Sequence, residues 1–157
     1  MKIGIFVYSQ TGNTSSVAKT LQEKLAASGH EVKAEAILPA GKLHPGKKEV
    51  EFQSKPDPAE YDGLILAAPV QAFSLSEGMK AYVSQLEASA LEGKEIGCFV
   101  TKQLPGKWTG GNRALRQIRS LCKEKGGTIA SSSIIIWSSK KRDAMIHDTM
   151  ATLGALF

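Results

Sequence analysis

The chain has 157 residues, of which 42% are hydrophobic, and it carries a formal net charge of +5. This length suits one globular domain, so we expect residues 1–157 to form a single domain. No apolar run approaches the roughly 18 residues that a membrane span needs, and the start MKIGIFVYSQ turns polar too early for a signal peptide, so we expect a soluble cytoplasmic protein with no membrane partner.

Short apolar runs alternate with longer segments of helical periodicity, which is typical of βαβ units around a parallel sheet. In chain order, we predict a strand at 3–8, a helix at 14–28, an edge strand at 30–38, a strand at 61–70, a helix at 76–89, a strand at 94–101, a helix at 111–126, a strand at 128–137 and a helix at 142–157. The predicted fold class is therefore α/β, a three-layer sandwich in which helices cover both faces of a five-stranded parallel sheet.

Residues 38–61 interrupt this alternation. They hold four of the six prolines and show no helical stripe, so we predict a crossover that is mostly loop, with a turn of helix at best. Among the other residues, Cys98 and Cys122 lie in apolar patterns without a CxxC motif or a histidine cluster, and we expect two buried thiols, no disulfide framework and no metal site.

In open parallel sheets, ligands bind beyond the carboxyl ends of the strands, so the loops at 9–14, 68–76 and 101–112 are the candidate site. The first loop precedes a helix, whose unpaired N–H groups and dipole favour an anion. Its donors carry no positive charge, a set that suits a phosphate monoester: Ser9, Gln10, Thr11, Gly12, Asn13 and Thr14. Capping of the helix by one of the hydroxyls is the alternative.

Other phosphate loops do not fit this stretch. The GxGxxG dinucleotide fingerprint is absent from the loop, and GxxxxGK[ST] occurs nowhere in the chain. Phosphorelay receiver domains share the architecture but need acidic residues at the ends of the first and third strands, where this chain has Tyr8 and Ser9, and Ala68 and Pro69.

The motif SQTGNT, with Ala18 and Leu21 behind it, resembles the flavodoxin signature, in which a hydroxyl-rich loop after the first strand wraps the phosphate of FMN. The predicted order of strands and helices matches that family over nearly the whole chain. Val7 departs from the pattern, since the signature prefers an aromatic residue there. The resemblance implies an FMN cofactor whose phosphate lies on residues 9–14.

The resemblance also places the flavin ring between the second and third loops. The second loop contributes Pro69, Val70, Gln71, Ala72 and Phe73, and Phe73 is its only aromatic able to cover a ring face. Packing of Phe73 on the core is the alternative. The third loop contributes Thr101, Lys102, Gln103, Trp108, Gly110 and Gly111. Trp108 would stack on or shield the ring, the glycines would allow close backbone approach, and Lys102 lies near the ring or in solvent.

Two functions from different classes are consistent with this site. As a flavodoxin-like electron carrier, the protein passes electrons to a redox partner protein and needs no catalytic side chain. As an NAD(P)H-dependent FMN reductase, it transfers hydride equivalents to quinone-like acceptors. We favour the carrier, acting as a monomer or weak dimer, because reductases of this fold tend to be longer.

Two features separate this chain from the usual one-electron shuttle. Residues 69–73 lack the glycine whose peptide flips toward the reduced flavin, and a flip would drive a residue with a side chain to positive φ. The net positive charge predicts a less reducing flavin and an acidic partner. A nucleic-acid face on the run SSKKRD and the basic helix from Arg113 is the third interpretation, but we expect a solvated surface and no nucleic-acid partner.

Overall fold

The computed structural model describes residues 1–43, 49–106 and 109–157. Its central sheet has five parallel strands in the order β2-β1-β5-β7-β8, which confirms the predicted fold class and the edge position of the second strand. The strands are β1 (Lys2–Val7), β2 (Glu31–Ala36), β5 (Gly63–Gln71), β7 (Glu95–Lys102) and β8 (Ile129–Ile136).

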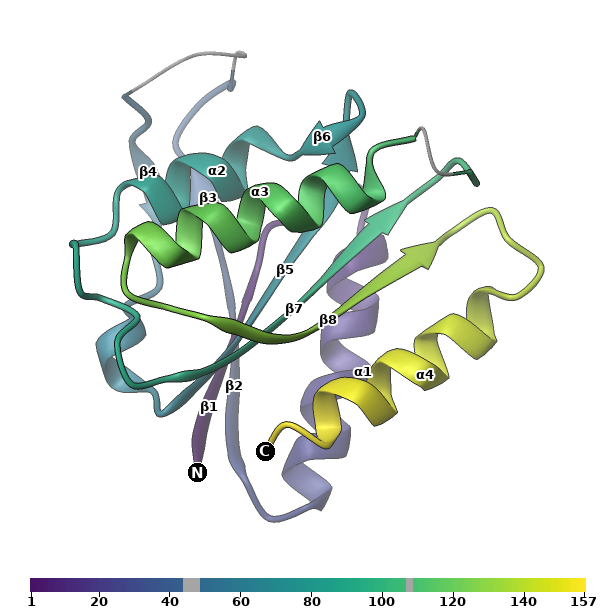
Figure 1. Cartoon of the computed structure of the whole chain (residues 1–157), viewed down its shortest axis with the longest axis horizontal. Helices are drawn as coiled ribbons and strands as arrows, with labels where there is room; N and C mark the ends of the chain where they lie inside the picture. The colour runs from purple at the N-terminus through teal and green to yellow at the C-terminus, as the bar shows by residue number, and fades with distance from the viewer. Residues whose placement is uncertain (44–48, 107–108) are drawn as a thin grey trace.

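Helices cover both faces of this sheet (Figure 1). The helices α2 (Glu77–Ser84) and α3 (Gly111–Glu124) lie side by side on one face, and α1 (Asn13–Ala27) and α4 (Arg142–Gly154) lie on the other. Each pair buries an apolar stripe against the sheet, so the core consists of two hydrophobic layers that the sheet separates.

The central strands are apolar because both of their faces are covered. Successive residues of a strand point to opposite faces, so Ile5 joins the layer under α1 and α4, and Phe6 joins the layer under α2 and α3. Phe6 packs edge to face against Tyr61 and Tyr82, with ring centroids 5.4 and 6.0 Å away.

The segment at 38–61 contains more structure than its sequence predicts. In its described part, β3 (Leu38–Pro39) and β4 (Phe52–Ser54) form a separate two-stranded antiparallel sheet, which the prediction did not include. The rest of the described segment is mostly loop, as predicted. The expected turn of helix is the 3-10 turn Pro58–Glu60, where the Asp57 carboxylate accepts a hydrogen bond of 3.0 Å from the N–H of Ala59.

Two further elements differ from the predicted pattern. A two-residue strand, β6 (Ser74–Leu75), turns back antiparallel on the end of β5. The helix predicted at 76–89 ends at Ser84. Beyond it the chain forms tighter turns, in one of which the N–H of Leu86 donates a hydrogen bond of 3.1 Å to the carbonyl of Val83.

The register of the sheet brings the carboxyl ends of its strands together. Val7 lies beside Ala67 in the ladder between β1 and β5, and Pro69 lies beside Thr101 in the ladder between β5 and β7. The three loops that follow these strands therefore meet at one edge of the sheet (Figure 1). Within the described ranges, no helix has the length and apolar character needed to cross a bilayer.

Candidate functional site

The first loop leaves the start of α1 uncapped. Gly12 occupies the N-cap position with a φ of 88°, and among the described residues no side chain caps the N–H groups of the first helical turn. The Ser9 hydroxyl instead accepts a hydrogen bond of 3.2 Å from the N–H of Gly12. The first intrahelical bond runs from the N–H of Ser16 to the carbonyl of Gly12 at 2.9 Å, so the helix itself provides no partner for the N–H groups of residues 13–15. The interpretation of the loop as a helix cap alone is therefore wrong. The arrangement favours an anion.

A buried pair of hydroxyls connects the first and third loops. Thr14 Oγ1 lies 2.8 Å from Thr101 Oγ1, and the two residues are 1% and 3% exposed. One hydroxyl donates to the other, which leaves the accepting hydroxyl with its own proton for a further partner. Thr14, which the sequence predicts to be a phosphate donor, is thus also a structural link between loops.

The second loop is a tight hairpin between β5 and β6. Gln71 pairs with Ser74 across it, and the two turn residues, Ala72 and Phe73, have φ values of 48° and 59°. Positive φ at both central positions is typical of a type I′ turn, in which glycine and asparagine are usual. Side chains make this conformation less favourable by about 1–3 kcal/mol per residue. The sequence predicts positive φ in residues 69–73 only if a peptide of this loop flips toward the flavin, whereas Ala72 and Phe73 already have positive φ in the structure.

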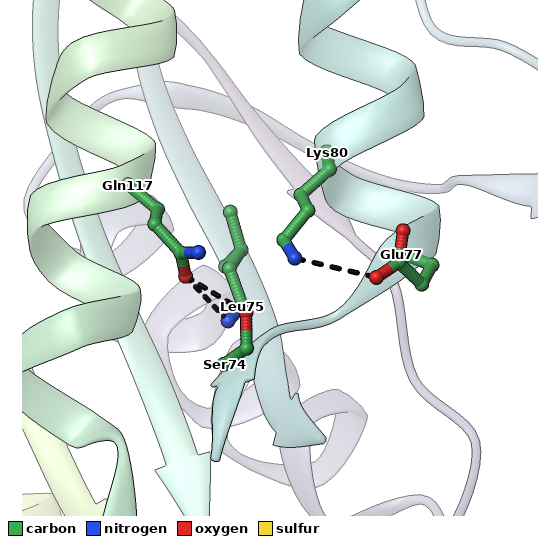
Figure 2. A network of polar contacts seen from close by, with 5 residues as sticks. All are labelled: Ser74, Leu75, Glu77, Lys80 and Gln117. Carbon is green, nitrogen blue, oxygen red and sulfur yellow. Dashed lines mark hydrogen bonds and ion pairs between the residues drawn. The ribbon is translucent and has the colours of Figure 1, made fainter. Parts of the chain in front are cut away.

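Gln117 of α3 holds this hairpin in place (Figure 2). Its side-chain Oε1 accepts hydrogen bonds from the N–H of Leu75 at 2.8 Å and from Ser74 Oγ at 3.1 Å. Beside it, Lys80 forms an ion pair of 3.3 Å with Glu77 in the first turn of α2. No local pattern indicated Gln117 as a site residue, because its partners lie more than 40 residues away in the chain.

The third loop is held by a buried lysine. Lys102 is 8% exposed, and its ammonium donates to the carbonyl of Gly106 at 2.8 Å and to Thr109 Oγ1 at 2.7 Å. Burial lowers the pKa of Lys102 below its ordinary value, because the charged form loses hydration. The interpretation of Lys102 as a solvated lysine is wrong.

The two glycines of the third loop bring protein segments together. Gly110 has a φ of 94°, and a methyl group on it would lie 2.3 Å from the carbonyl carbon of Phe73. Gly111 packs against the Ile134 side chain, where an added methyl would lie 3.1 Å from its Cδ1. The close approach predicted for these glycines is therefore made to the second loop and to β8. Trp108 lies outside the described residues.

A cleft of about 140 Å³ lies between the three loops. The cleft is lined by residues that the sequence predicts for the site, namely Gln10, Thr11, Asn13, Pro69, Val70, Gln71, Thr101, Lys102 and Gln103. The remaining described candidates lie around the cleft and do not line it, namely Ser9, Gly12, Thr14, Ala72, Phe73, Gly110 and Gly111. Phe73 is 55% exposed, so its predicted alternative, packing on the core, is wrong.

A pair of amide side chains bounds the cleft. Gln71 Nε2 donates to Gln10 Oε1, and Gln10 Nε2 donates to the Tyr8 hydroxyl at 3.0 Å. A second cleft of about 560 Å³ shares Gln10 and Gln71 with the first, is also lined by Tyr8, and continues to Lys42 and Glu77. Tyr8 was not a predicted site residue, since its position directly after the apolar strand β1 indicates a core residue, and it is indeed buried.

Comparison with solved structures identifies the fold. The chain superposes on flavodoxin 1 from Bacillus cereus with a TM-score of 0.73 and 16% identity, covering 99% of this chain and 96% of that one. A flavodoxin from Streptococcus pneumonia TIGR4 superposes with a TM-score of 0.70 and 16% identity, with full coverage of both chains. The two-electron reduced flavodoxin from Megasphaera elsdenii superposes with a TM-score of 0.64 and 19% identity, covering 95% of this chain and 98% of that one.

The identity in these comparisons is low, so they establish the flavodoxin-like fold and nothing finer. No protein-family model and no curated protein sequence matches the chain. The resemblance predicted from SQTGNT is confirmed at the level of the fold.

Proposed function

We propose that this chain, which has the flavodoxin-like fold, binds FMN in the cleft between its three loops and carries electrons to a partner protein. The observation that carries the proposal is the uncapped start of α1 beside the cleft, preceded by a turn rich in neutral donors. Such a donor set fits a phosphate monoester, which gains many hydrogen bonds there without a paired cation.

The chain's own residues would hold the cofactor by position and hydrogen bonding. The N–H groups of residues 13–15 and the hydroxyls of Ser9 and Thr11 would bind the phosphate. The ring would lie between the second and third loops, where the exposed Phe73 can cover part of it. When bound, FMN supplies the electron-transfer chemistry, and the protein sets its orientation and its access to water.

Positive charge around the cleft would make the flavin less reducing. Lys102 lines the cleft with its ammonium buried, and the amino ends of α1 and α3 both begin at the loops that form it. Positive potential stabilises an anionic reduced flavin, because opposite charges attract more strongly in a poorly hydrated site. The matching partner is an acidic protein, and we expect the carrier to act as a monomer or weak dimer in the cytoplasm.

A reductase is the second candidate, and one observation favours it. The larger cleft of about 560 Å³ adjoins the first at Gln10 and Gln71, with Lys42 on its lining. It has the size typical of a small-molecule site and could take NAD(P)H or a quinone-like acceptor. Rapid reduction of the bound flavin by NADPH in a stopped-flow instrument, with no partner protein present, would establish the reductase and exclude the pure carrier.

A titration with two flavins tests the proposed cofactor. We expect FMN to bind at least about tenfold more tightly than riboflavin, which lacks the phosphate, as measured by quenching of flavin fluorescence. Thr11→Asp places a carboxylate in the loop and should weaken FMN binding but leave riboflavin binding unchanged. Thr20→Asp, on the exposed surface of α1 two turns away, is the matched control. Equal affinity for the two flavins, or no binding of either, would refute the proposal.

A further inference from the structure

The exposed face of α3 concentrates the positive charge of the molecule. Residues 111–126 contain five basic residues and one acidic residue, which gives four of the five net positive charges of the chain. The exposed basic residues of the helix are Arg113, Arg116, Arg119 and Lys123. They lie within one side of the helix and form a stripe about 15 Å long, at 1.5 Å per residue.

Carboxylates do not compensate this stripe within the described ranges. The ion pairs found there are Lys33–Glu35 at 3.8 Å and Lys80–Glu77 at 3.3 Å, neither of them on α3. Among the described side chains, the only hydrogen-bond partner of these four residues is Ser132, whose Oγ accepts from Arg119 Nη2 at 2.6 Å. Like charges three residues apart on a helix repel each other, so Arg113 and Arg116 do not help α3 to form.

The free end of the stripe lies next to the cleft. The helix begins at Gly111, and the preceding Gly110 is packed against the backbone of Phe73. Phe73 and Leu104 are each 55% exposed, although both are large and apolar. Leu104 belongs to the same loop cluster, since its carbonyl lies 3.0 Å from Thr109 Oγ1. Apolar side chains beside a charged rim are typical of a protein–protein interface.

We infer that Arg113 and Arg116, together with Phe73 and Leu104, form the docking surface for an acidic redox protein. This inference rests on the proposed function, because it assigns a surface to the partner of that carrier. Uncompensated arginines steer an acidic surface toward the cleft, and the apolar pair excludes water at the point where the cofactor edge would be reached. A nucleic acid is a poorer match, because four basic residues neutralise few phosphates and the aliphatic Leu104 offers no ring on which a base could stack.

Titration with a strongly acidic [2Fe–2S] ferredoxin tests the surface. Binding is followed by amide NMR shifts at low salt, with or without flavin, and electron transfer by stopped flow, in which one electron leaves the reduced cluster and enters the bound flavin. The test variant is Arg113→Glu/Arg116→Glu, which should keep α3 stable because glutamate forms helices about as well as arginine and is favourable in the first turn. The matched control, Lys19→Glu/Lys24→Glu on α1, makes the same change in net charge on the opposite face.

We expect shifts at the amino end of α3 and at residues 73 and 104, with the dissociation constant rising at least about tenfold in the test variant and less than about threefold in the control. Salt of about 0.5 M should raise the dissociation constant of the wild type about as much as the test substitutions do at low salt. Absence of binding at low salt, equal losses in both variants, or tighter binding of a single-stranded oligonucleotide at α3 would overturn the inference. A chain that binds the ferredoxin through α3 but takes up no FMN would support the surface and refute the proposed function.

Discussion

The hydroxyl pair Thr14–Thr101 is the most enclosed polar contact of the candidate site, at 2.8 Å and nearly out of solvent. Thr14→Val keeps the shape of the side chain but leaves the Thr101 hydroxyl buried without this partner. We expect the free energy of unfolding to fall by about 1–3 kcal/mol, measured by urea denaturation. The double variant Thr14→Val/Thr101→Val should recover much of that loss, and strictly additive losses would show that the two hydroxyls are not coupled.

Gly110 and Gly106 allow the effect of crowding to be separated from the effect of backbone conformation. Both have positive φ, at 94° and 98°, but a methyl group on Gly110 would meet the Phe73 backbone at 2.3 Å. A methyl group on Gly106 would have no atom within 4 Å from the described residues beyond its neighbours in the chain. Gly106→Ala should therefore lower the free energy of unfolding by about 1 kcal/mol, and Gly110→Ala by at least about 2 kcal/mol more. Equal losses in chemical denaturation would mean that the second loop moves away freely.

At the scale of elements, the hairpin between β5 and β6 stores backbone strain. Ala72 has a φ of 48°, where a side chain is unfavourable and glycine is not. Ala72→Gly should therefore raise the free energy of unfolding by about 1 kcal/mol in urea. The same substitution at the exposed Ala144 of α4 should lower it by about 1 kcal/mol, because glycine is a poor helix former. Destabilisation by Ala72→Gly would contradict the assigned turn conformation.

The strands of the main sheet and the four helices could be predicted because their patterns are local and several turns or residues long. The apolar run of β5 and the stripe of α3 fix their elements without help from distant residues. The strands β3, β4 and β6 have two or three residues each, too few for an alternation to be visible. Their pairing depends on tertiary neighbours, which the sequence pattern does not contain.

The candidate cleft could be predicted for a similar reason. Its lining follows the ends of three parallel strands, and topology alone places those ends together. Gln117 could not be found this way, because it reaches the hairpin from the middle of a helix. The buried state of Lys102 also depends on the third loop folding back over its ammonium, a contact that charge and spacing do not reveal.

At the scale of the whole molecule, one of the two hydrophobic layers that the sheet separates contains two titratable thiols. Cys98 of β7 and Cys122 of α3 lie together in the layer under α2 and α3, both fully buried. Burial raises the pKa of each thiol to about 12, from an ordinary value of 9.0, because the thiolate loses hydration. The folded protein therefore keeps two protons that the unfolded chain releases above pH 9.

This difference predicts a loss of stability in mild alkali. Below pH 9 both states hold the protons and nothing changes; between pH 9 and 12 the unfolded chain binds fewer protons, so the free energy of unfolding falls as pH rises. The expected slope approaches about 1.4 kcal/mol per pH unit for each thiol. Urea denaturation at pH 8 and pH 10, with a reductant present, measures it. Staying at or below pH 10 limits the parallel effect of Tyr61 and Tyr82, whose pKa values burial also raises.

Lys102 acts in the opposite direction and requires a control. Because burial lowers its pKa, the folded protein loses that proton before the unfolded chain does, and stability from this group rises as pH approaches 10.5. Cys98→Ala/Cys122→Ala keeps Lys102 and both tyrosines, so subtracting its pH profile from that of the wild type isolates the thiols. The variant should be less stable at pH 8, because it leaves small cavities, yet lose less stability on going to pH 10. Parallel profiles would show that the two cysteines ionise in the folded protein as readily as in the unfolded chain, and that the layer under α3 admits water.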